Sequence, residues 1–146
     1  MISSLNLEWI DVVEITRGWT RLHLPLVKPE LNRKLRQGVY QMLYKGAVIK
    51  NGCFGEGIGK GISKRFNQYR STISRLDLIR NGTLSKNGSF KTIHLLDLKL
   101  SPGETVQVRS ARVPDDMFIN NLPWKVDLYA IEAYLKELHK DTIWLI

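Results

Sequence analysis

The sequence has few of the residues from which several common classes of site are built. Of its 146 residues, one is a cysteine, Cys53, and three are histidines. A single cysteine excludes an internal disulfide and is typical of a reducing compartment. The histidines lie far apart and no CxxC pair occurs, so the pattern predicts no zinc-type cluster.

Long apolar runs are also missing. No stretch approaches the roughly 20 residues needed to span a bilayer, and the first five residues lack the charged and apolar regions of a signal peptide. We therefore expect a soluble, cytoplasmic protein without a membrane partner. With 43% hydrophobic residues the chain can build a core. Its length suits one domain over residues 1–146.

Acidic residues are the third shortage. The chain has 14 of them against 22 lysines and arginines, a net charge of +8. Residues 58–91 alone carry +7, because Asp77 is the one acidic residue among eight basic ones. The eight are Lys60, Lys64, Arg65, Arg70, Arg75, Arg80, Lys86 and Lys91. Such concentration favours a polyanionic partner, most often nucleic acid, although a solvated face on a basic protein also explains it.

The apolar pattern predicts an α+β fold. Alternating runs on either side of Arg17-Gly18, and again on either side of Lys45-Gly46, are typical of β-hairpins. Other segments repeat apolar residues at helical spacing. Strands linked as hairpins with helices between them favour a small, mostly antiparallel sheet flanked by helices. The predicted strands are 9–15, 19–24, 39–44, 47–49 and 105–109, and the predicted helices are 30–36, 62–73, 89–100 and 127–140.

A glycine-rich loop precedes the basic helix. Residues 55–61 read Gly-Glu-Gly-Ile-Gly-Lys-Gly, which matches neither the dinucleotide fingerprint GxGxxG nor the phosphate loop GxxxxGK[ST]. The Glu56 carboxylate would also repel phosphate. No GxSxG hydrolase elbow occurs. The loop therefore predicts a sharp backbone turn close to a ligand rather than a nucleotide site.

Three short stretches resemble a known family. Gly38-Val39-Tyr40 is followed by Cys53-Phe54-Gly55 and then by Lys64-Arg65-Phe66 on a predicted helix. This order resembles the GIY-YIG nuclease superfamily. The stretches "SKRFNQYRSTI", "KTIHLLDLKLSPGETVQVRSAR" and "DLYAIEAYLKEL" are similar to phage members of that superfamily. The resemblance covers most of residues 38–146 and leaves residues 1–36 outside, as an extra N-terminal β-hairpin and short helix.

The resemblance implies a metal-dependent DNA endonuclease that hydrolyses phosphodiester bonds with water and leaves a 5′-phosphate. Tyr40 then lies in the site, against the attacking water or the phosphate. Arg65 binds the scissile phosphate, and Glu132 holds one divalent metal, usually Mg²⁺. These roles suit the residue types, because a guanidinium meets two phosphate oxygens at once and magnesium commonly uses one carboxylate plus substrate oxygens.

Two positions depart from the family pattern. Cys53 stands where the superfamily usually has a tyrosine, and Leu145 lies near the place of a late asparagine. Because the hairpin pairs the two tripeptides, we expect Tyr40 and Cys53 to lie side by side, facing the site. Cys53 is therefore the fourth candidate catalytic residue.

The remaining interpretations concern partners. The candidate DNA contacts are Lys60, Lys64, Arg70, Arg75 and Lys91. A homodimer is compatible with the chemistry, since cutting two strands needs two sites or two events. Two other functions stay open at this point. One is a non-catalytic nucleic-acid-binding module on the same fold, and the other is a basic scaffold protein.

Overall fold

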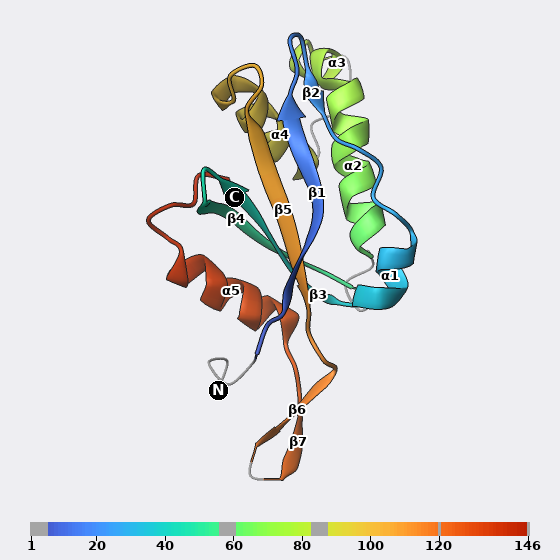
Figure 1. Ribbon diagram of the computed structural model, residues 1–146, viewed down its shortest axis with the longest axis vertical. Helices are drawn as coiled ribbons and strands as arrows, with labels where there is room; N and C mark the ends of the chain where they lie inside the picture. The colour runs from blue at the N-terminus through green and yellow to red at the C-terminus, as the bar shows by residue number, and fades with distance from the viewer. Residues whose placement is uncertain (1–5, 56–60, 83–87, 120, 146) are drawn as a thin grey trace.

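The computed structural model describes residues 6–55, 61–82, 88–119 and 121–145. Figure 1 shows a central sheet with helices on both sides and a separate hairpin projecting from one end. The strands are β1 (Trp9–Arg17), β2 (Leu22–His23), β3 (Gly38–Tyr44), β4 (Ala47–Phe54), β5 (Thr105–Arg112), β6 (Asp116–Ile119) and β7 (Leu122–Lys125). The helices are α1 (Glu30–Leu35), α2 (Ile62–Ser74), α3 (Leu76–Arg80), α4 (Gly88–Lys99) and α5 (Leu128–Leu138).

The five-stranded sheet has the order β2-β1-β5-β3-β4. Every neighbouring pair is antiparallel, which confirms the predicted α+β fold. The N-terminal hairpin forms as predicted, but it is not an appendage. Strand β1 pairs with β5 along its length, from Trp9 opposite Ala111 to Thr16 opposite Thr105. The hairpin thus supplies two strands of the central sheet.

Helices cover both faces of the sheet (Figure 1). On one face α2 and α4 contribute Phe66 and Ile93, both fully buried, to the larger core. On the other face α5 packs Ile131 against Val39 and Ala111. The predicted start of the last helix is confirmed, because the Asp127 side chain accepts hydrogen bonds from two backbone amides of its first turn. No helix among the described residues is both long and apolar enough to cross a bilayer.

Several elements differ from the sequence prediction. Strand β4 continues beyond its predicted end at Ile49 to Phe54. Residues 50–52 are polar or glycine, a composition typical of a loop, but here they belong to the strand and line a cavity. The short helix α3 and the hairpin β6–β7 were not predicted. Pro114 and Pro123 interrupt the alternating pattern by which the β6–β7 hairpin could have been predicted. In its turn Asn121 has a φ of 63°, a conformation that asparagine tolerates.

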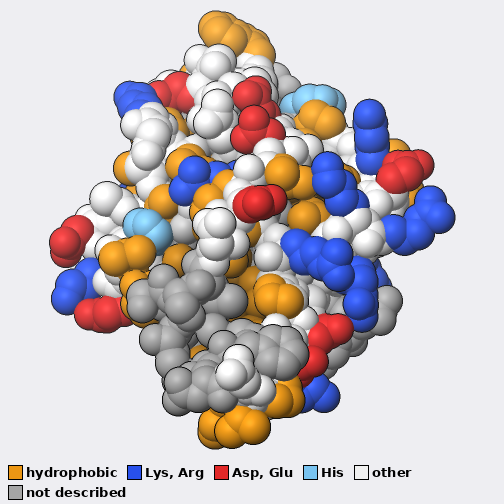
Figure 2. Space-filling view, turned by 60° about the horizontal axis from the view of Figure 1, so that its bottom comes forward, with side chains coloured by type: hydrophobic (Ala, Val, Ile, Leu, Met, Phe, Trp, Pro, Cys, Tyr) orange, Lys and Arg blue, Asp and Glu red, His pale blue; other side chains and the backbone are white. Residues whose placement is uncertain are grey.

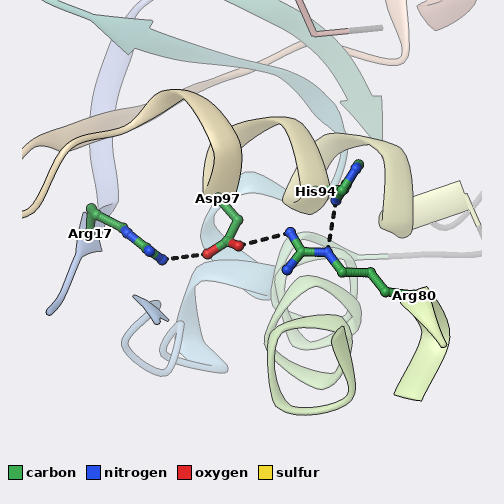
Figure 3. Close-up of polar contacts among 4 residues, drawn as sticks. All are labelled: Arg17, Arg80, His94 and Asp97. Atoms are coloured by element: carbon green, nitrogen blue, oxygen red, sulfur yellow. Dashed lines mark hydrogen bonds and ion pairs between the residues drawn. The ribbon is translucent and has the colours of Figure 1, made fainter. Parts of the chain in front are cut away.

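A charged network joins helices α3 and α4 to the end of strand β1. Asp97 on α4 accepts hydrogen bonds from Arg17 at the end of β1 and from Arg80 on α3, the latter at 2.8 Å (Figure 3). Arg80 Nε also donates to His94 Nδ1 at 3.0 Å. The Arg17 and Asp97 side chains are 17% and 14% exposed, so water compensates little if either partner is lost.

We expect Asp97→Asn to lower the free energy of unfolding by about 2–3 kcal/mol. The value lies below the loss of about 3–5 kcal/mol typical of a fully buried pair, because this pair keeps some solvent contact. Urea unfolding measures the difference. The control is Glu137→Gln, which breaks the exposed pair with Lys140 and should change stability by less than about 0.5 kcal/mol. Equal effects of the two substitutions would contradict a structural role for the network.

Candidate active site

A polar cavity of about 500 Å³ lies along β4, between helices α2 and α5. Strand β4 is an edge of the sheet, so the two helices, which cover opposite faces, both reach the cavity past that edge. Segments far apart in the sequence therefore meet here. The lining residues are Tyr40, Lys50, Asn51, Gly52, Cys53, Arg65, Gln68, Tyr69, Ser71, Arg75, Ser89, Glu132 and Lys136.

An irregularity in β4 decides which side chains face which helix. The register shifts between Met42 and Leu43, where Val48 pairs with Leu43 and Lys50 pairs with Met42, so Ile49 is the extra residue of a bulge. Beyond it, Lys50 shares the face of Met42 and therefore the α2 side. Residue 51 takes the other face, and its side-chain amide accordingly donates to the Leu135 carbonyl of α5 at 3.3 Å.

The prediction that Tyr40 and Cys53 lie side by side is wrong in its register. Tyr40 stands opposite Gly52, and Cys53 stands opposite Val39. Side chains alternate between the faces of a sheet, so the phenol and the thiol leave the sheet on opposite sides. Both residues nevertheless line the same cavity, because it wraps around the sheet edge.

Tyr40 reaches the cavity across a glycine. A Cβ atom at Gly52 would lie 2.3 Å from Cζ of the Tyr40 ring, so no larger residue fits at position 52 with the ring in this place. The ring packs edge-on against Phe66, and its hydroxyl lies 3.0 Å from the hydroxyl of Tyr69. Burial, followed by the neighbouring Tyr69, raises the pKa of Tyr40 well above its ordinary value. The phenol is therefore protonated at neutral pH.

Arg65 enters the cavity from the first half of α2. Its Nη2 atom donates a long hydrogen bond, 3.4 Å, to the backbone carbonyl of Cys53 on the sheet edge. Its Nε atom is buried, and no group among the described residues accepts a hydrogen bond from it. A buried donor without an acceptor is costly. The guanidinium is therefore suited to an anionic ligand that can accept from it.

Glu132 approaches from α5 and carries the cavity's one carboxylate among the described residues. It forms an ion pair of 2.8 Å with Lys136, one turn along the helix. Burial acts to raise the pKa of Glu132, but hydrogen bonds from Cys53 and Lys136 and the charges of Lys136 and Lys50 outweigh it and lower the pKa overall. Glu132 is therefore ionised at neutral pH.

The thiol of Cys53 is a hydrogen-bond donor here. Burial, together with the hydrogen bond and charge of Glu132, raises the pKa of Cys53 to about 12. A thiol with that pKa stays protonated near neutral pH and cannot serve as a base there.

Among the cavity residues that were not recognised from the sequence as part of a site, Lys50 and Tyr69 are the two that bear on its chemistry. Lys50 is 7% exposed, and burial, with the charges of Lys136 and Arg65 opposed by Glu132, lowers its pKa to about 8. The only local signal was a basic residue just beyond an apolar strand. Tyr69 was assigned to the buried stripe of α2. Its spacing of four residues from Arg65 places both on one side of the helix, and that signal was present in the sequence.

The predicted DNA-contacting residues are only partly gathered here. Arg75 lines the cavity, whereas Arg70 lies on another flank of α2. Lys64 and Lys91 are exposed on α2 and α4 and do not line the cavity. Lys60 and most of the glycine loop lie outside the described residues. Figure 2 shows lysine and arginine side chains gathered mainly on one side of the face that it displays.

Comparison with known proteins gives little. No family model matches the chain, and no curated protein matches it. Among solved structures, the chain is similar to the restriction endonuclease HPY188I in complex with product DNA. That similarity has a TM-score of 0.46 and 20% sequence identity and covers 89% of this chain and 72% of the other. A similarity of this extent decides neither a family nor an activity.

Proposed function

We propose that this protein is a metal-dependent DNA endonuclease that hydrolyses phosphodiester bonds and leaves a 5′-phosphate. The observation that carries the proposal is the composition of the β4-edge cavity. It holds the Arg65 guanidinium, whose buried Nε atom has no acceptor among the described residues, together with two phenols, one carboxylate and further cations. Four of these residues, Tyr40, Cys53, Arg65 and Glu132, are the ones that the resemblance to the GIY-YIG superfamily singled out.

Arg65 is the proposed contact to the scissile phosphate. Attack by water on phosphorus builds negative charge on the non-bridging oxygens, and a guanidinium offers two parallel donors to such oxygens. A phosphate oxygen would also satisfy the buried Nε atom. Arg75, Lys50 and Lys136 line the same cavity and add positive charge around the anion.

Tyr40 is proposed to orient the attacking water. Its raised pKa makes it a neutral hydroxyl that can donate to a phosphate oxygen and accept from the water. Lys50 is the cavity side chain whose pKa is lowered toward neutrality, to about 8, so its neutral fraction can accept the water proton. The new bond joins the water oxygen to phosphorus, the bond from phosphorus to the 3′ oxygen breaks, and the 3′ oxygen takes a proton from solvent to leave as a 3′-hydroxyl.

Glu132 is the residue that would hold the divalent cation. Among the described residues no group of three or more histidines, cysteines and acids gathers at one place, so a metal held wholly by the protein is not supported. An ionised carboxylate beside a roomy, polar cavity fits magnesium, which keeps water and substrate oxygens as its other ligands. When bound, such an ion stabilises charge on the leaving oxygen.

Plasmid nicking tests the proposal directly. Supercoiled DNA incubated with the protein should be nicked in Mg²⁺ and remain intact in chelator, and labelling should find phosphate on the 5′ ends. Binding without cleavage in both conditions would instead favour the non-catalytic nucleic-acid-binding module. That outcome would overturn the endonuclease proposal.

The roles of Tyr40 and Cys53 can be separated by two conservative substitutions. Tyr40→Phe removes the hydroxyl and should lower the cleavage rate by about 100-fold, the scale seen when one well-placed donor is lost. Cys53→Ser keeps a donor toward Glu132 and should change the rate by less than about threefold. Single-turnover rates measure both. A fast Tyr40→Phe protein beside an inactive Cys53→Ser protein would reverse the assignment.

Lys50 makes DNA binding depend on pH. Because its pKa in the free protein is lowered to about 8, its positive charge is complete well below pH 8 and is lost as the pH rises above it. We expect affinity, measured in chelator, to fall between pH 7 and pH 9. In Lys50→Arg the charge persists through this range, so that fall should disappear. An identical pH dependence in both proteins would show that another group titrates.

A further inference from the structure

A second hollow lies on the other flank of α2. It has a volume of about 470 Å³ and runs between α2 and the segment that contains β2. Arg21 and His23 stand on the β2 side, and Asn67, Arg70 and Ser74 stand on the helix side. We refer to it as the α2–β2 groove. One of its walls belongs to the part of the chain that lies outside the resemblance to the nuclease superfamily.

The groove adjoins the β4-edge cavity. Ser71 lines both, and Arg75 of the cavity donates through Nη2 to Ser71 Oγ at 2.7 Å. From Arg65 to Ser71 the helix axis advances about 9 Å, at 1.5 Å per residue. A strand of B-DNA spaces its phosphates about 3.4 Å apart along its axis. For a strand that runs along α2, this advance corresponds to two or three nucleotides from a phosphate bound at Arg65.

The charge of the groove suits a phosphate backbone. Two guanidiniums and one imidazole line it, and its lining includes no acidic residue among the described parts of the chain. Arg70 is held in place, because its Nε atom donates to the Leu24 carbonyl at 3.0 Å. Because this hydrogen bond fixes the Arg70 side chain, less conformational entropy is lost when the other guanidinium nitrogens bind an anion.

The next hollow beyond Arg21 marks the end of the basic path. It is lined by Asp77 and Asp97 as well as by Arg21 and Arg80. The Asp97 charge is paired with Arg17 and Arg80 (Figure 3), but Asp77 adds a carboxylate that would repel a phosphate. The basic surface thus extends from the β4-edge cavity to Arg21 and stops there.

We propose that the α2–β2 groove binds the DNA backbone two or three nucleotides from the scissile phosphate. The inference rests on the proposed endonuclease function, and it deepens that function by extending the substrate surface to the N-terminal hairpin. Arg21 and Arg70 contact phosphates, and Asn67 and Ser71 supply neutral donors. The groove carries positioning contacts, which are independent of base sequence.

The test uses the salt dependence of binding. Fluorescence anisotropy in chelator measures the affinity of the full chain for a labelled duplex at several salt concentrations. Each phosphate neutralised by the protein adds about 0.9 to the slope of log K against log salt. We expect Arg21→Ser to reduce the slope by about 0.9. Asn67→Glu, at an exposed position of α2 where glutamate has a better helix propensity than asparagine, should weaken binding severalfold without harming the helix.

The control variant is Arg112→Ser. Arg112 is also exposed, and it lies at the end of β5 next to Trp9, whereas β2 pairs with the opposite end of β1. Its slope should equal that of the parent protein. Parental slopes and affinities in both Arg21→Ser and Asn67→Glu would overturn the groove proposal, even for a protein that cleaves DNA. Altered binding in those variants with no cleavage in Mg²⁺ would support the groove and contradict the endonuclease.

Discussion

Arg65→Ala is expected to lower the rate of DNA cleavage by about 10³-fold, near the upper end of the effect of removing one preorganised donor at a developing charge. The reason is the position of the guanidinium. It reaches the cavity beside the sheet edge, with a buried Nε atom that no described residue satisfies and with Nη2 held only by a 3.4 Å contact. A phosphate oxygen in the cavity would accept hydrogen bonds from this guanidinium.

Arg65→Lys separates charge from geometry. Lysine keeps the positive charge but has no planar fork, so we expect it to restore less than a tenth of the lost activity. The measurement is the single-turnover rate at saturating protein. Lys140→Ala, which removes an exposed cation at the end of α5, serves as the matched control and should retain the parental rate. Near-full activity of Arg65→Lys would show that Arg65 contributes only its positive charge and not a specific bidentate contact.

Glu132→Gln is expected to abolish magnesium-dependent cleavage, with a loss of at least about 10³-fold. The substitution keeps the shape of the side chain and removes the one carboxylate that the described cavity offers to a cation. DNA affinity measured in chelator should be maintained or increased, because a negative charge beside Lys136 and Lys50 is lost. Loss of cleavage with retained binding is therefore the diagnostic combination.

A control for Glu132 is available on the same helix. Glu137 lies on α5, pairs with Lys140 and has a side chain that is 74% exposed. Glu137→Gln makes the same chemical change away from the cavity and should leave cleavage unchanged. If Glu132→Gln cleaved DNA at the parental rate in ordinary magnesium, Glu132 would not be the metal-holding residue.

Much of the secondary structure could be predicted from local patterns. Alternation around Arg17-Gly18 and Lys45-Gly46 located both hairpins, and helical spacing located α2 and α4 almost to their ends. Arg65 was correctly placed on a helix. These features depend on neighbours within about one turn or one hairpin, which the sequence records directly. The β6–β7 hairpin was missed because its strands are short and interrupted by proline.

The arrangement of the site could not be read in the same way. Whether Lys50 faces α2 or α5 depends on the bulge at Ile49, which shifts the alternation by one residue. The expected pairing of the two tripeptides took no account of this shift and therefore misplaced Tyr40 relative to Cys53. The pairing of β1 with β5 joins Thr16 to Thr105, far beyond any local signal. The lowered pKa of Lys50 arises from burial and from charges on α2 and α5.

The sequence by itself determined the excess of positive charge and most of the helices and strands, and it singled out Tyr40, Arg65 and Glu132 as candidates for a phosphate site. Tertiary structure decided that Tyr40 and Glu132, 92 positions apart in the sequence, line one cavity at the edge of β4. It also decided that the N-terminal hairpin builds a wall of the α2–β2 groove. Periodicity is a property of neighbouring residues, whereas strand order, register and the electrostatic environment of a buried group depend on contacts between distant ones.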